Sequence, residues 1–223
     1  MILNFYFFRH AESEYNAEGQ KIGGQSNNLT LSKRGIEQAE ALGRRLLQER
    51  MVLDEIYSST AVRAINTAEI VARLIGYPIE RIATVPELLE LSQGDWEGKV
   101  RAEIYTPEVL AEMKRLSWDF RAPRGESQRD VEHRVSRWVG NNLIAHQRQD
   151  INVGLFGHGH ATKCFLRWVM NSDPSLTYKI EIDNCSITNL KYFSNDPHKG
   201  WRIVKINDNA HLRNLGFAGE GYG

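Results

Sequence analysis

Two stretches of the sequence place imidazole and guanidinium groups directly after buried strands. Residues 2–8 are apolar, aromatic and β-branched, as in a strand buried on both faces, and Arg9 and His10 follow at once. Residues 151–156 end in a similar way, at Gly157-His158-Gly159-His160. Ligands of open α/β sheets bind at the carboxyl ends of the strands. These side chains therefore indicate a site for an anion such as a phosphoryl group.

A third cation, Arg63, falls in the first turn of a predicted helix. The strand over residues 54–58 leads directly into this helix, which ends at Gly76. A cation in the first turn opposes the helix dipole, but a bound phosphate would be shared by the helix amides and the guanidinium. We interpret Arg63 as a phosphate ligand. For each of these cations, a solvated or purely structural role is the alternative.

A candidate acid, Glu90, lies between the leucines at positions 88, 89 and 91. Apolar neighbours would desolvate the carboxylate and raise its pKa, which a general acid needs at neutral pH. Glu87, Asp95 and Glu97 are competing carboxylates in the same stretch. The sequence therefore predicts a proton donor here, with Glu90 preferred over the other three.

Other phosphate and metal chemistries leave patterns that this sequence lacks. His158 and His160 are possible metal ligands, yet neither an H-E-x-x-H motif nor an acidic cluster accompanies them. Residues 94–99 have one residue too few between their glycines for a nucleotide-binding loop. Neither Cys164 nor Cys185 begins a C-x5-R motif, and no D-x-D motif is present. Cysteine-based and aspartate-based phosphatases are thus excluded.

Length and charge limit the number of domains and the kinds of partner. The 223 residues, 41% of them hydrophobic and 25% charged, predict one α/β domain over residues 1–223, with a mobile tail over 207–223. The 28 Lys and Arg balance the 28 Asp and Glu, which favours neither a nucleic-acid nor a membrane partner. Two cysteines without a disulfide pattern, and an N-terminal apolar run too short to span a membrane, predict a cytoplasmic protein.

The apolar pattern predicts the elements that carry these groups. A helix follows Thr30 or Ser32, another begins at Pro107, and a third follows the cap pair Ser127 and Asp130. A further helix spans residues 161–170 and is buried. Strands are predicted over 82–85, 179–183, 186–192 and 201–206.

Five motifs, taken in order, resemble those of the histidine phosphatase superfamily. They are Phe8-Arg9-His10-Ala11-Glu12-Ser13 with Asn16, Ser58-Ser59-Thr60-Ala61-Val62-Arg63-Ala64 with Thr67-Ala68, Glu90 four residues before Gly94, Gly125-Glu126-Ser127, and Gly157-His158-Gly159. The similarity extends to residues 207–212. It implies a phosphoglycerate mutase-like fold, which is a three-layer α/β/α architecture with a mostly parallel central sheet. Ala11, where many members have glycine, and Arg124, where glycine often stands, depart from the pattern.

The resemblance implies roles for eight residues. His10 becomes phosphorylated, and Glu90 protonates the leaving group and then deprotonates water. The phosphoryl oxygens are held by three cationic side chains: Arg9, Arg63 and His158. Secondary phosphate contacts come from Asn16, Gly23 and the amide of Gly159. No metal or other cofactor is implied, because two guanidiniums and an imidazole stabilise the phosphoryl charge.

We therefore expect a metal-independent phosphomonoesterase that acts on a small phosphorylated substrate. A phosphoglycerate mutase is the first alternative, although residues 98–123 lack the long insertion with which mutases cage their intermediate. A non-catalytic phosphate-binding or partner-binding protein is the second. Specificity is expected to depend on the loop over 19–28, the segment over 101–121 and Arg124. The sequence predicts neither the substrate nor the oligomeric state.

Overall fold

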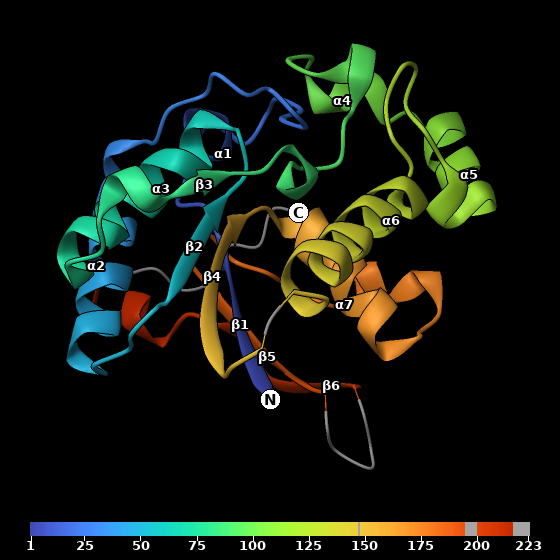
Figure 1. The fold of residues 1–223 in the computed structure, drawn as a ribbon. Helices are drawn as coiled ribbons and strands as arrows, with labels where there is room; N and C mark the ends of the chain where they lie inside the picture. Colours follow the sequence, from blue (N-terminus) through green and yellow to red (C-terminus); the bar gives the residue numbers. More distant parts are fainter. Residues whose placement is uncertain (147, 195–199, 216–223) are drawn as a thin grey trace.

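The centre of the computed structural model, which describes residues 1–146, 148–194 and 200–215, is a six-stranded sheet (Figure 1). Its strands are β1 (Ile2–Arg9), β2 (Glu55–Ser58), β3 (Ala83–Thr84), β4 (Ile151–Gly157), β5 (Ile187–Phe193) and β6 (Gly200–Asp208). Their order across the sheet is β3-β2-β4-β1-β5-β6, and among them β5 alone runs in the direction opposite to the other five. The predicted α/β fold with a mostly parallel sheet is confirmed.

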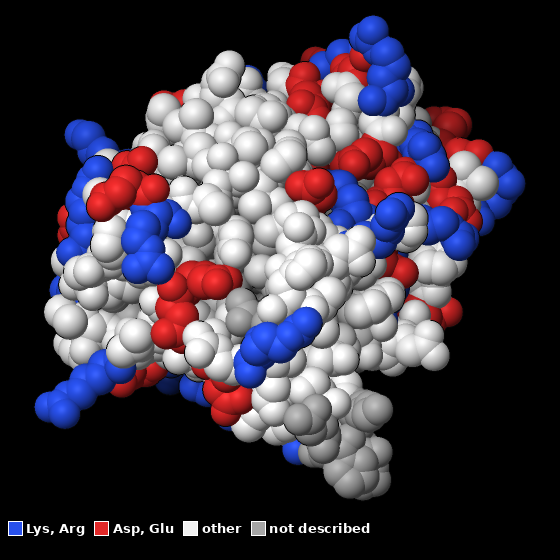
Figure 2. Space-filling view, in the orientation of Figure 1, with Lys and Arg blue, Asp and Glu red and all other residues white. Residues whose placement is uncertain are grey.

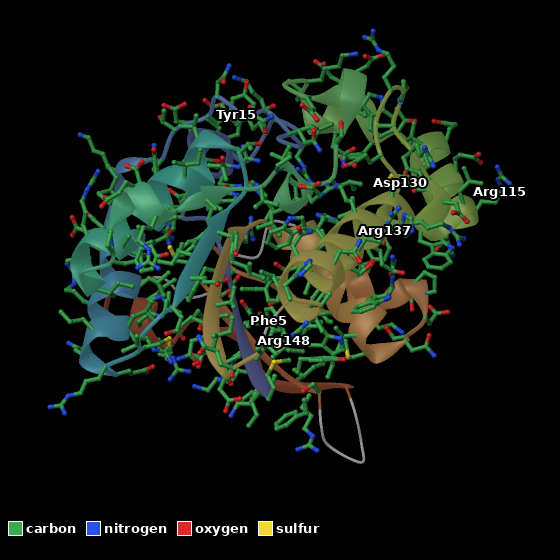
Figure 3. All side chains as sticks on the ribbon, in the orientation of Figure 1. Phe5, Tyr15, Arg115, Asp130, Arg137 and Arg148 are labelled. Carbon is green, nitrogen blue, oxygen red and sulfur yellow. The ribbon has the colours of Figure 1, made fainter. Side chains whose placement is uncertain are left out.

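Helices cover both faces of the sheet and complete three layers (Figure 1). On one face lie α2 (Lys33–Gln48) and α3 (Val62–Ile75). On the other face lie α6 (Gln128–Trp138) and α7 (Gly159–Met170). The pleat of β1 explains the division, because Phe5 and Phe7 pack toward α6 and α7 while Phe8 packs toward α2 and α3. Figure 3 shows Phe5 on β1, enclosed by the layers. Among the described residues, no helix is both long and apolar enough to cross a bilayer.

The helices begin and end at capping residues that the sequence predicts. The hydroxyls of Ser32 and Thr106 each accept a backbone N–H from the first turn of their helices. Ser127 and Asp130 form the predicted capping box of α6. Gly76 ends α3 with a φ of 73°, a left-handed conformation that glycine adopts without strain.

The predicted strand over 179–183 is wrong. A 3₁₀ helix spans Pro174–Tyr178, and the residues after it form no sheet ladder. The carbonyl of Ile182 accepts a hydrogen bond of 2.5 Å from the Arg9 guanidinium, and the N–H of Asp183 donates to the side chain of Asn207 at 2.7 Å. Two of the backbone groups that a strand would pair, the carbonyl of Ile182 and the N–H of Asp183, are thus bound to side chains.

The start of the predicted mobile tail is tied to the fold. β6 continues through Asp208, and a 3₁₀ helix, η7, spans Ala210–Leu215. Asp208 forms an ion pair of 2.7 Å with Arg45 of α2, and Leu212 is buried against the same layer. Residues 216–223, the rest of that predicted tail, lie outside the described residues.

A separate group of short helices lies beyond the carboxyl ends of the central strands (Figure 1). It consists of α4 (Arg101–Ile104), α5 (Pro107–Leu116) and the 3₁₀ helix η4 (Ser117–Asp119), and none of their residues is buried. Charged side chains of both signs are interspersed over this region (Figure 2), and Arg115 points outward from α5 (Figure 3). We call these three helices the cap.

Candidate active site

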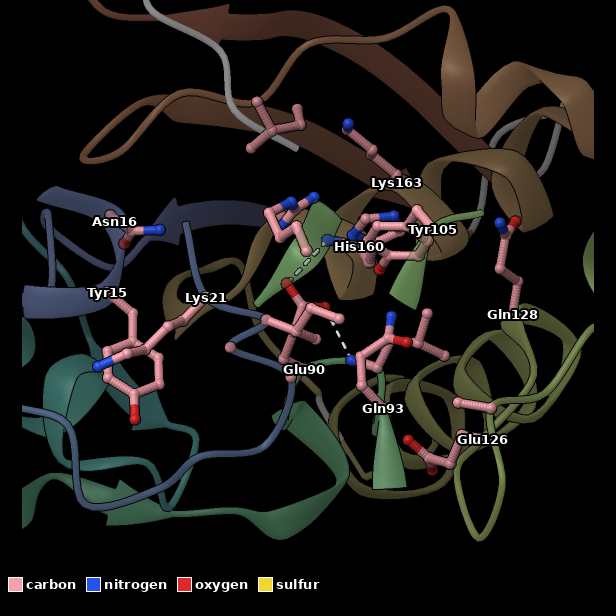
Figure 4. A pocket seen from close by; sticks show the side chains of 18 of the residues that line it. Tyr15, Asn16, Lys21, Glu90, Gln93, Tyr105, Glu126, Gln128, His160 and Lys163 are labelled. Atoms are coloured by element: carbon pink, nitrogen blue, oxygen red, sulfur yellow. Dashed lines mark hydrogen bonds between the residues drawn. The ribbon is translucent and has the colours of Figure 1, made fainter. Parts of the chain in front are cut away.

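A cavity of about 340 Å³ opens at the carboxyl ends of β1 and β4. Seven of the eight predicted site residues line it, namely Arg9, His10, Asn16, Gly23, Arg63, Glu90 and Gly159. Figure 4 looks into this cavity, with Tyr15, Asn16 and Lys21 on one side and Lys163 and Gln128 on the other. The structure thus brings together residues from both strand ends and from α3.

His10 follows β1 directly and is 4% exposed. Its Nδ1–H donates to the carbonyl of Ala11 at 2.7 Å, and its Nε2 accepts a hydrogen bond of 3.2 Å from Arg63 Nε. Burial lowers the pKa of His10 well below its ordinary value, and the charges of Arg63 and Arg9 lower it further. The imidazole is therefore neutral at pH 7, with the lone pair on Nε2.

Arg63 is held by the loop over residues 19–28. Its guanidinium donates to the carbonyls of Gly24 at 2.9 Å and Ser26 at 2.7 Å. Burial lowers the pKa of Arg63 to about 10, so the side chain stays cationic at neutral pH. The resemblance implies a phosphate contact from Gly23 in this loop, whereas the neighbouring Gly24 offers its carbonyl to Arg63. Gly23 does line the cavity.

Arg9 and Asn16 both keep hydrogen-bond donors that no described residue uses. Arg9 donates through Nη1 to the carbonyl of Ile182, but its buried Nε has no partner. Asn16 accepts through Oδ1 from the N–H and the hydroxyl of Ser13, which leaves its Nδ2 free within the described ranges. A buried guanidinium with an unused N–H and a free amide in the same cavity are suited to bind an anion.

His158 is the one predicted site residue that does not line the cavity. It is fully buried, and its Nδ1 accepts from Arg63 at 3.3 Å while its Nε2 is 2.7 Å from Ser59 Oγ. Its ring lies 5.0 Å from that of His10, edge to face. Burial lowers the pKa of His158 well below its ordinary value, and Arg63 adds to the effect. The Arg63 guanidinium thus donates a hydrogen bond to each of the two imidazoles. His158 lies behind Arg63 rather than on the cavity wall.

Glu90 differs from the prediction in its charge state. Burial alone would raise its pKa, but the nearby His160 and backbone N–H groups stabilise the carboxylate, so the pKa is lowered. The carboxylate accepts from the N–H groups of Leu91 at 2.8 Å and His160 at 3.1 Å (Figure 4), and from the N–H of Ala161 at 3.2 Å. The last two belong to the first turn of α7, where the helix dipole favours an anion. The predicted raised pKa of Glu90 is therefore wrong.

The three competing carboxylates lie outside the cavity lining. Asp95 forms an ion pair with Arg124 at the surface, and the carboxylate of Glu97 is bound to backbone N–H groups of neighbouring loops. Glu87 does not reach the cavity either. Of the four candidates for the acid, Glu90 alone lines the cavity. Arg124, a predicted specificity residue, is also absent from the cavity wall.

Two residues without a role in the sequence interpretation hold the loop that carries Glu90. Arg134 of α6 donates to the carbonyls of Glu87 at 2.6 Å and Glu90 at 2.9 Å, and it pairs with Glu126 at 2.9 Å. Glu126 also accepts from the N–H of Ser92 at 3.1 Å. The signal for Glu126 was the Gly125-Glu126-Ser127 motif, whereas nothing in the sequence pointed to Arg134.

His160 lies beside Glu90, and its N–H donates to the Glu90 carboxylate (Figure 4). The two histidines that the sequence suggests as possible metal ligands thus have different neighbours, Glu90 for one and Arg63 for the other. Over the described ranges, no three His, Cys, Asp or Glu side chains are grouped as metal ligands would be.

The outer wall of the cavity comes from the segment predicted to set specificity. Its side chains are mainly aromatic or apolar, and they include Tyr105, Leu110, Met113 and Phe120. Leu110 and Met113 belong to the apolar stripe of α5, which faces the cavity instead of a core. Arg101 and Lys163, to which the sequence interpretation gave no individual role, also line the wall.

Comparison with known sequences agrees with these motifs. The sequence profile of the histidine phosphatase superfamily (branch 1) matches residues 5–209. A probable phosphoglycerate mutase GpmB of Proteus mirabilis is 29% identical over 218 residues, which cover 96% of this chain and 97% of that protein. Its counterpart in Salmonella choleraesuis is 29% identical over 215 residues, which cover 95% of each.

Solved structures share the fold over nearly the whole chain. YhfR of Bacillus stearothermophilus has a TM-score of 0.79 and 27% identity, over 94% of this chain and 99% of that one. A mycobacterial glucosyl-3-phosphoglycerate phosphatase has a TM-score of 0.76 and 24% identity, over 93% and 100%. A phosphoserine phosphatase of Entamoeba histolytica, solved with 3-phosphoglyceric acid, has a TM-score of 0.76 and 21% identity, over 94% and 99%. The last two likenesses concern the fold alone.

Proposed function

Because the chain belongs to the histidine phosphatase superfamily, we propose that it is a metal-independent phosphomonoester hydrolase that acts on a small phosphorylated metabolite through a phosphohistidine on His10. The state of His10 carries this proposal. Its imidazole is neutral, its Nδ1–H is bound to the carbonyl of Ala11, and its Nε2 faces the Arg63 guanidinium in the cavity. An imidazole with one unprotonated nitrogen is the form that attacks phosphorus.

In the first half-reaction, His10 Nε2 bonds to phosphorus while the bond from phosphorus to the alcohol oxygen breaks. Charge in this transition state lies on the equatorial phosphoryl oxygens, which Arg9 and Arg63 neutralise without a metal ion. His158 joins them when Arg63 exchanges its bonds to the two imidazoles for bonds to the phosphoryl oxygens.

Glu90 supplies the proton that the leaving oxygen takes up. Its pKa is lowered in this structure, and an incoming phosphate dianion raises it again because like charges disfavour the carboxylate. Glu90 therefore binds a proton together with the substrate and passes it to the leaving oxygen. The resulting carboxylate then deprotonates a water molecule, whose oxygen bonds to phosphorus while His10 leaves as neutral imidazole.

Trapping the intermediate tests this proposal. After incubation with a radiolabelled phosphomonoester and an alkaline quench, we expect acid-labile phosphate on the wild-type protein and none on His10→Ala. His133→Ala, which changes an exposed histidine of α6, is the matched control and should trap label as the wild type does. Label that persists in His10→Ala, or that is found on Asp or Ser, contradicts the proposal.

Metal independence has a separate test. Dialysis against EDTA should leave the hydrolysis rate intact, because guanidinium groups supply the charge that a metal ion would otherwise provide. Loss of activity that zinc or manganese restores would contradict this part of the proposal and would direct attention to His158 and His160.

A phosphoglycerate mutase is the second candidate function, and two observations favour it. The curated relatives carry that name, and side chains of the cap line the cavity, where they would enclose part of a bound intermediate. We favour the hydrolase because Leu110 on the cap is 51% exposed, which leaves water a route to the cavity. Phosphate release should exceed bisphosphoglycerate-stimulated interconversion of 2- and 3-phosphoglycerate when both are measured on one preparation, and the opposite result favours the mutase.

A further inference from the structure

The carboxylate of Glu97 lies outside the cavity lining and has no part in the proposed mechanism. Its Oε1 nevertheless accepts from the N–H groups of Gln25 at 2.9 Å and Gln93 at 3.0 Å, and from the hydroxyl of Ser92 at 3.4 Å. Gln25 belongs to the loop over residues 19–28, whereas Ser92 and Gln93 belong to the loop that carries Glu90. Glu97 therefore joins two loops that border the cavity.

A single peptide group, the one between Gly24 and Gln25, connects Glu97 with Arg63. Its N–H donates to Glu97 Oε1 at 2.9 Å, and its carbonyl accepts from Arg63 Nη2 at 2.9 Å. Each of these hydrogen bonds polarises the peptide in the direction that strengthens the other. The carboxylate and the guanidinium are thus linked through the two polar ends of one peptide group.

The close approach of Glu97 to this peptide requires glycine at position 24. Gly24 has a φ of 51°, in the left-handed region that glycine adopts without strain. A Cβ at this position would lie only 2.5 Å from Glu97 Oε1. The loop is therefore shaped around the Glu97 carboxylate.

Arg63 depends on this loop when it changes its partners. In the proposed mechanism, its bonds to the two imidazoles give way to bonds to the phosphoryl oxygens. The carbonyls of Gly24 and Ser26 are then the contacts that keep the guanidinium in place, at 2.9 and 2.7 Å. A shift of the loop would move both carbonyls, and the cation would move with them.

Charge favours the same arrangement. Burial lowers the pKa of Arg63 to about 10 and Arg9 lowers it further, whereas the carboxylates of Glu90 and, to a lesser extent, Glu97 raise it. When Glu90 takes up a proton together with the substrate, it no longer offsets the charge of Arg63. Glu97 takes no part in that proton transfer, so it remains as the second carboxylate near the cation.

We propose that Glu97 is a positioning residue for phosphoryl transfer, which holds the Arg63 guanidinium through the peptide between Gly24 and Gln25. Because it acts on the cation that binds the phosphoryl group, its loss affects every phosphomonoester. This role rests on the proposed function, whereas the hold on Arg63 can be measured by phosphate binding alone.

Three substitutions separate the hydrogen bond of Glu97 from its charge. Glu97→Ala should lower kcat/KM about 10- to 100-fold for an alkyl and an aryl phosphate alike, as expected for the loss of a hydrogen bond to a charged group. Glu97→Gln keeps an oxygen for the N–H of Gln25 and should lose about 5-fold or less. Glu97→Asp keeps the charge but is one methylene shorter, so it should lose nearly as much as Glu97→Ala. The reverse order, with Asp active and Gln impaired, overturns the proposal.

A double-mutant cycle with Arg63→Gln distinguishes positioning from general damage to the fold. In the Arg63→Gln background, Glu97→Ala should change kcat/KM for p-nitrophenyl phosphate by about 3-fold at most, because the cation that Glu97 holds is already absent. A loss of the same size with and without Arg63 overturns the proposal. Circular dichroism confirms that each variant is folded.

Asp95→Ala is the matched control, since Asp95 lies in the same segment and pairs with Arg124 at the surface. Its kcat/KM should stay within about 2-fold of the wild-type value. A loss in Glu97→Ala that is confined to the alkyl phosphate overturns the proposal, because Glu97 would then act through the loop that carries the proposed acid, Glu90.

Binding of inorganic phosphate separates this proposal from a failure of the proposed function. In the His10→Ala background, Glu97→Ala should bind phosphate about 3- to 10-fold more weakly than Glu97→Gln, which has the same net charge, as measured by isothermal titration calorimetry. Equal affinity overturns the hold on Arg63. Failure of the proposed function gives a different result, namely no hydrolysis and no phosphohistidine with Glu97 intact. The weaker binding in Glu97→Ala would support the hold on Arg63 in that case as well.

Discussion

The inner and outer parts of the cavity are built in opposite ways. In the inner part, Arg9, His10 and Arg63 are at most 9% exposed, and each is bound to backbone carbonyls of other segments or of its neighbour. In the outer part, the cap contains no buried residue, and Leu110 on its inner stripe is 51% exposed. The side chains of the inner part are thus buried and held by hydrogen bonds, whereas the cap buries none of its residues.

This difference separates the chemistry from the choice of substrate. Side chains at the strand ends are held by the sheet and by the helices that follow it, so they meet every phosphoryl group in one geometry. A segment that buries nothing can change its side chains at little cost to the fold. Substitutions in the inner part should therefore affect all substrates, and substitutions in the cap should affect only some.

The largest effect is expected for Arg63→Gln. Loss of this guanidinium should lower kcat/KM by about 10³- to 10⁵-fold for an alkyl and an aryl phosphate alike, because the charge on the phosphoryl oxygens loses its partner. Steady-state kinetics on both esters measure this, with circular dichroism to confirm folding. Arg73→Gln, at an exposed position of the same helix, is the control and should change kcat/KM by about 2-fold at most. A loss confined to one ester would contradict the comparison.

Glu90→Gln should come next, and its effect should depend on the leaving group. Phosphorylation of His10 by an alkyl phosphate should slow about 10²- to 10⁴-fold, whereas p-nitrophenyl phosphate should be affected mildly because its phenolate hardly needs a proton. Dephosphorylation should slow for both esters. Single-turnover kinetics separate the two steps. Equal losses in the phosphorylation step would remove Glu90 from the acid role, and Glu87→Gln, outside the cavity, is the control.

A smaller effect is expected on the pH dependence of stability. The pKa values of His10 and His158 are lowered well below the ordinary value, so the unfolded chain binds more protons than the folded protein below about pH 6.5. Their contribution to stability is complete above that pH. It falls by about 1.4 kcal/mol per pH unit for each histidine as the pH drops toward the lowered pKa values.

Urea unfolding between about pH 7.5 and 5 measures this slope. His158→Gln should make the slope shallower by one histidine's share, and His133→Gln, at an exposed position, should leave it as in the wild type. An unchanged slope in His158→Gln would show that His158 does not titrate as proposed.

The smallest effect is expected in the cap, for Leu110→Ala. This half-exposed side chain buries little apolar area, so the variant should fold as the wild type does. KM should rise about 2- to 10-fold for esters with an extended apolar part, while kcat with p-nitrophenyl phosphate should stay close to the wild-type value. A fall in kcat comparable to that of Arg63→Gln would place the cap in the chemistry and break the division between the two parts.

The fold class and the position of most site residues along the chain could be predicted from the sequence. Arg9 and His10 follow an apolar strand, Arg63 begins a helix that follows another, and Gly76 ends that helix. Ser127 and Asp130 cap α6 as predicted. These features depend on the period of apolar residues and on hydrogen bonds between residues close in the chain, and sequence spacing reports both.

The charge states and the partners of these groups, by contrast, depend on contacts between residues far apart in the chain. The leucine neighbours of Glu90 predicted a raised pKa. However, the backbone N–H groups of His160 and Ala161 in α7, 70 and 71 residues later in the chain, donate to the Glu90 carboxylate, and its pKa is lowered. His158 lies behind Arg63 rather than on the cavity wall. The strand predicted over 179–183 does not form, and the carbonyl of Ile182 accepts from the Arg9 guanidinium instead. The charge state and the partners of each of these groups depend on the donors and charges that lie within a few ångströms of it in space. Sequence spacing does not report such distances.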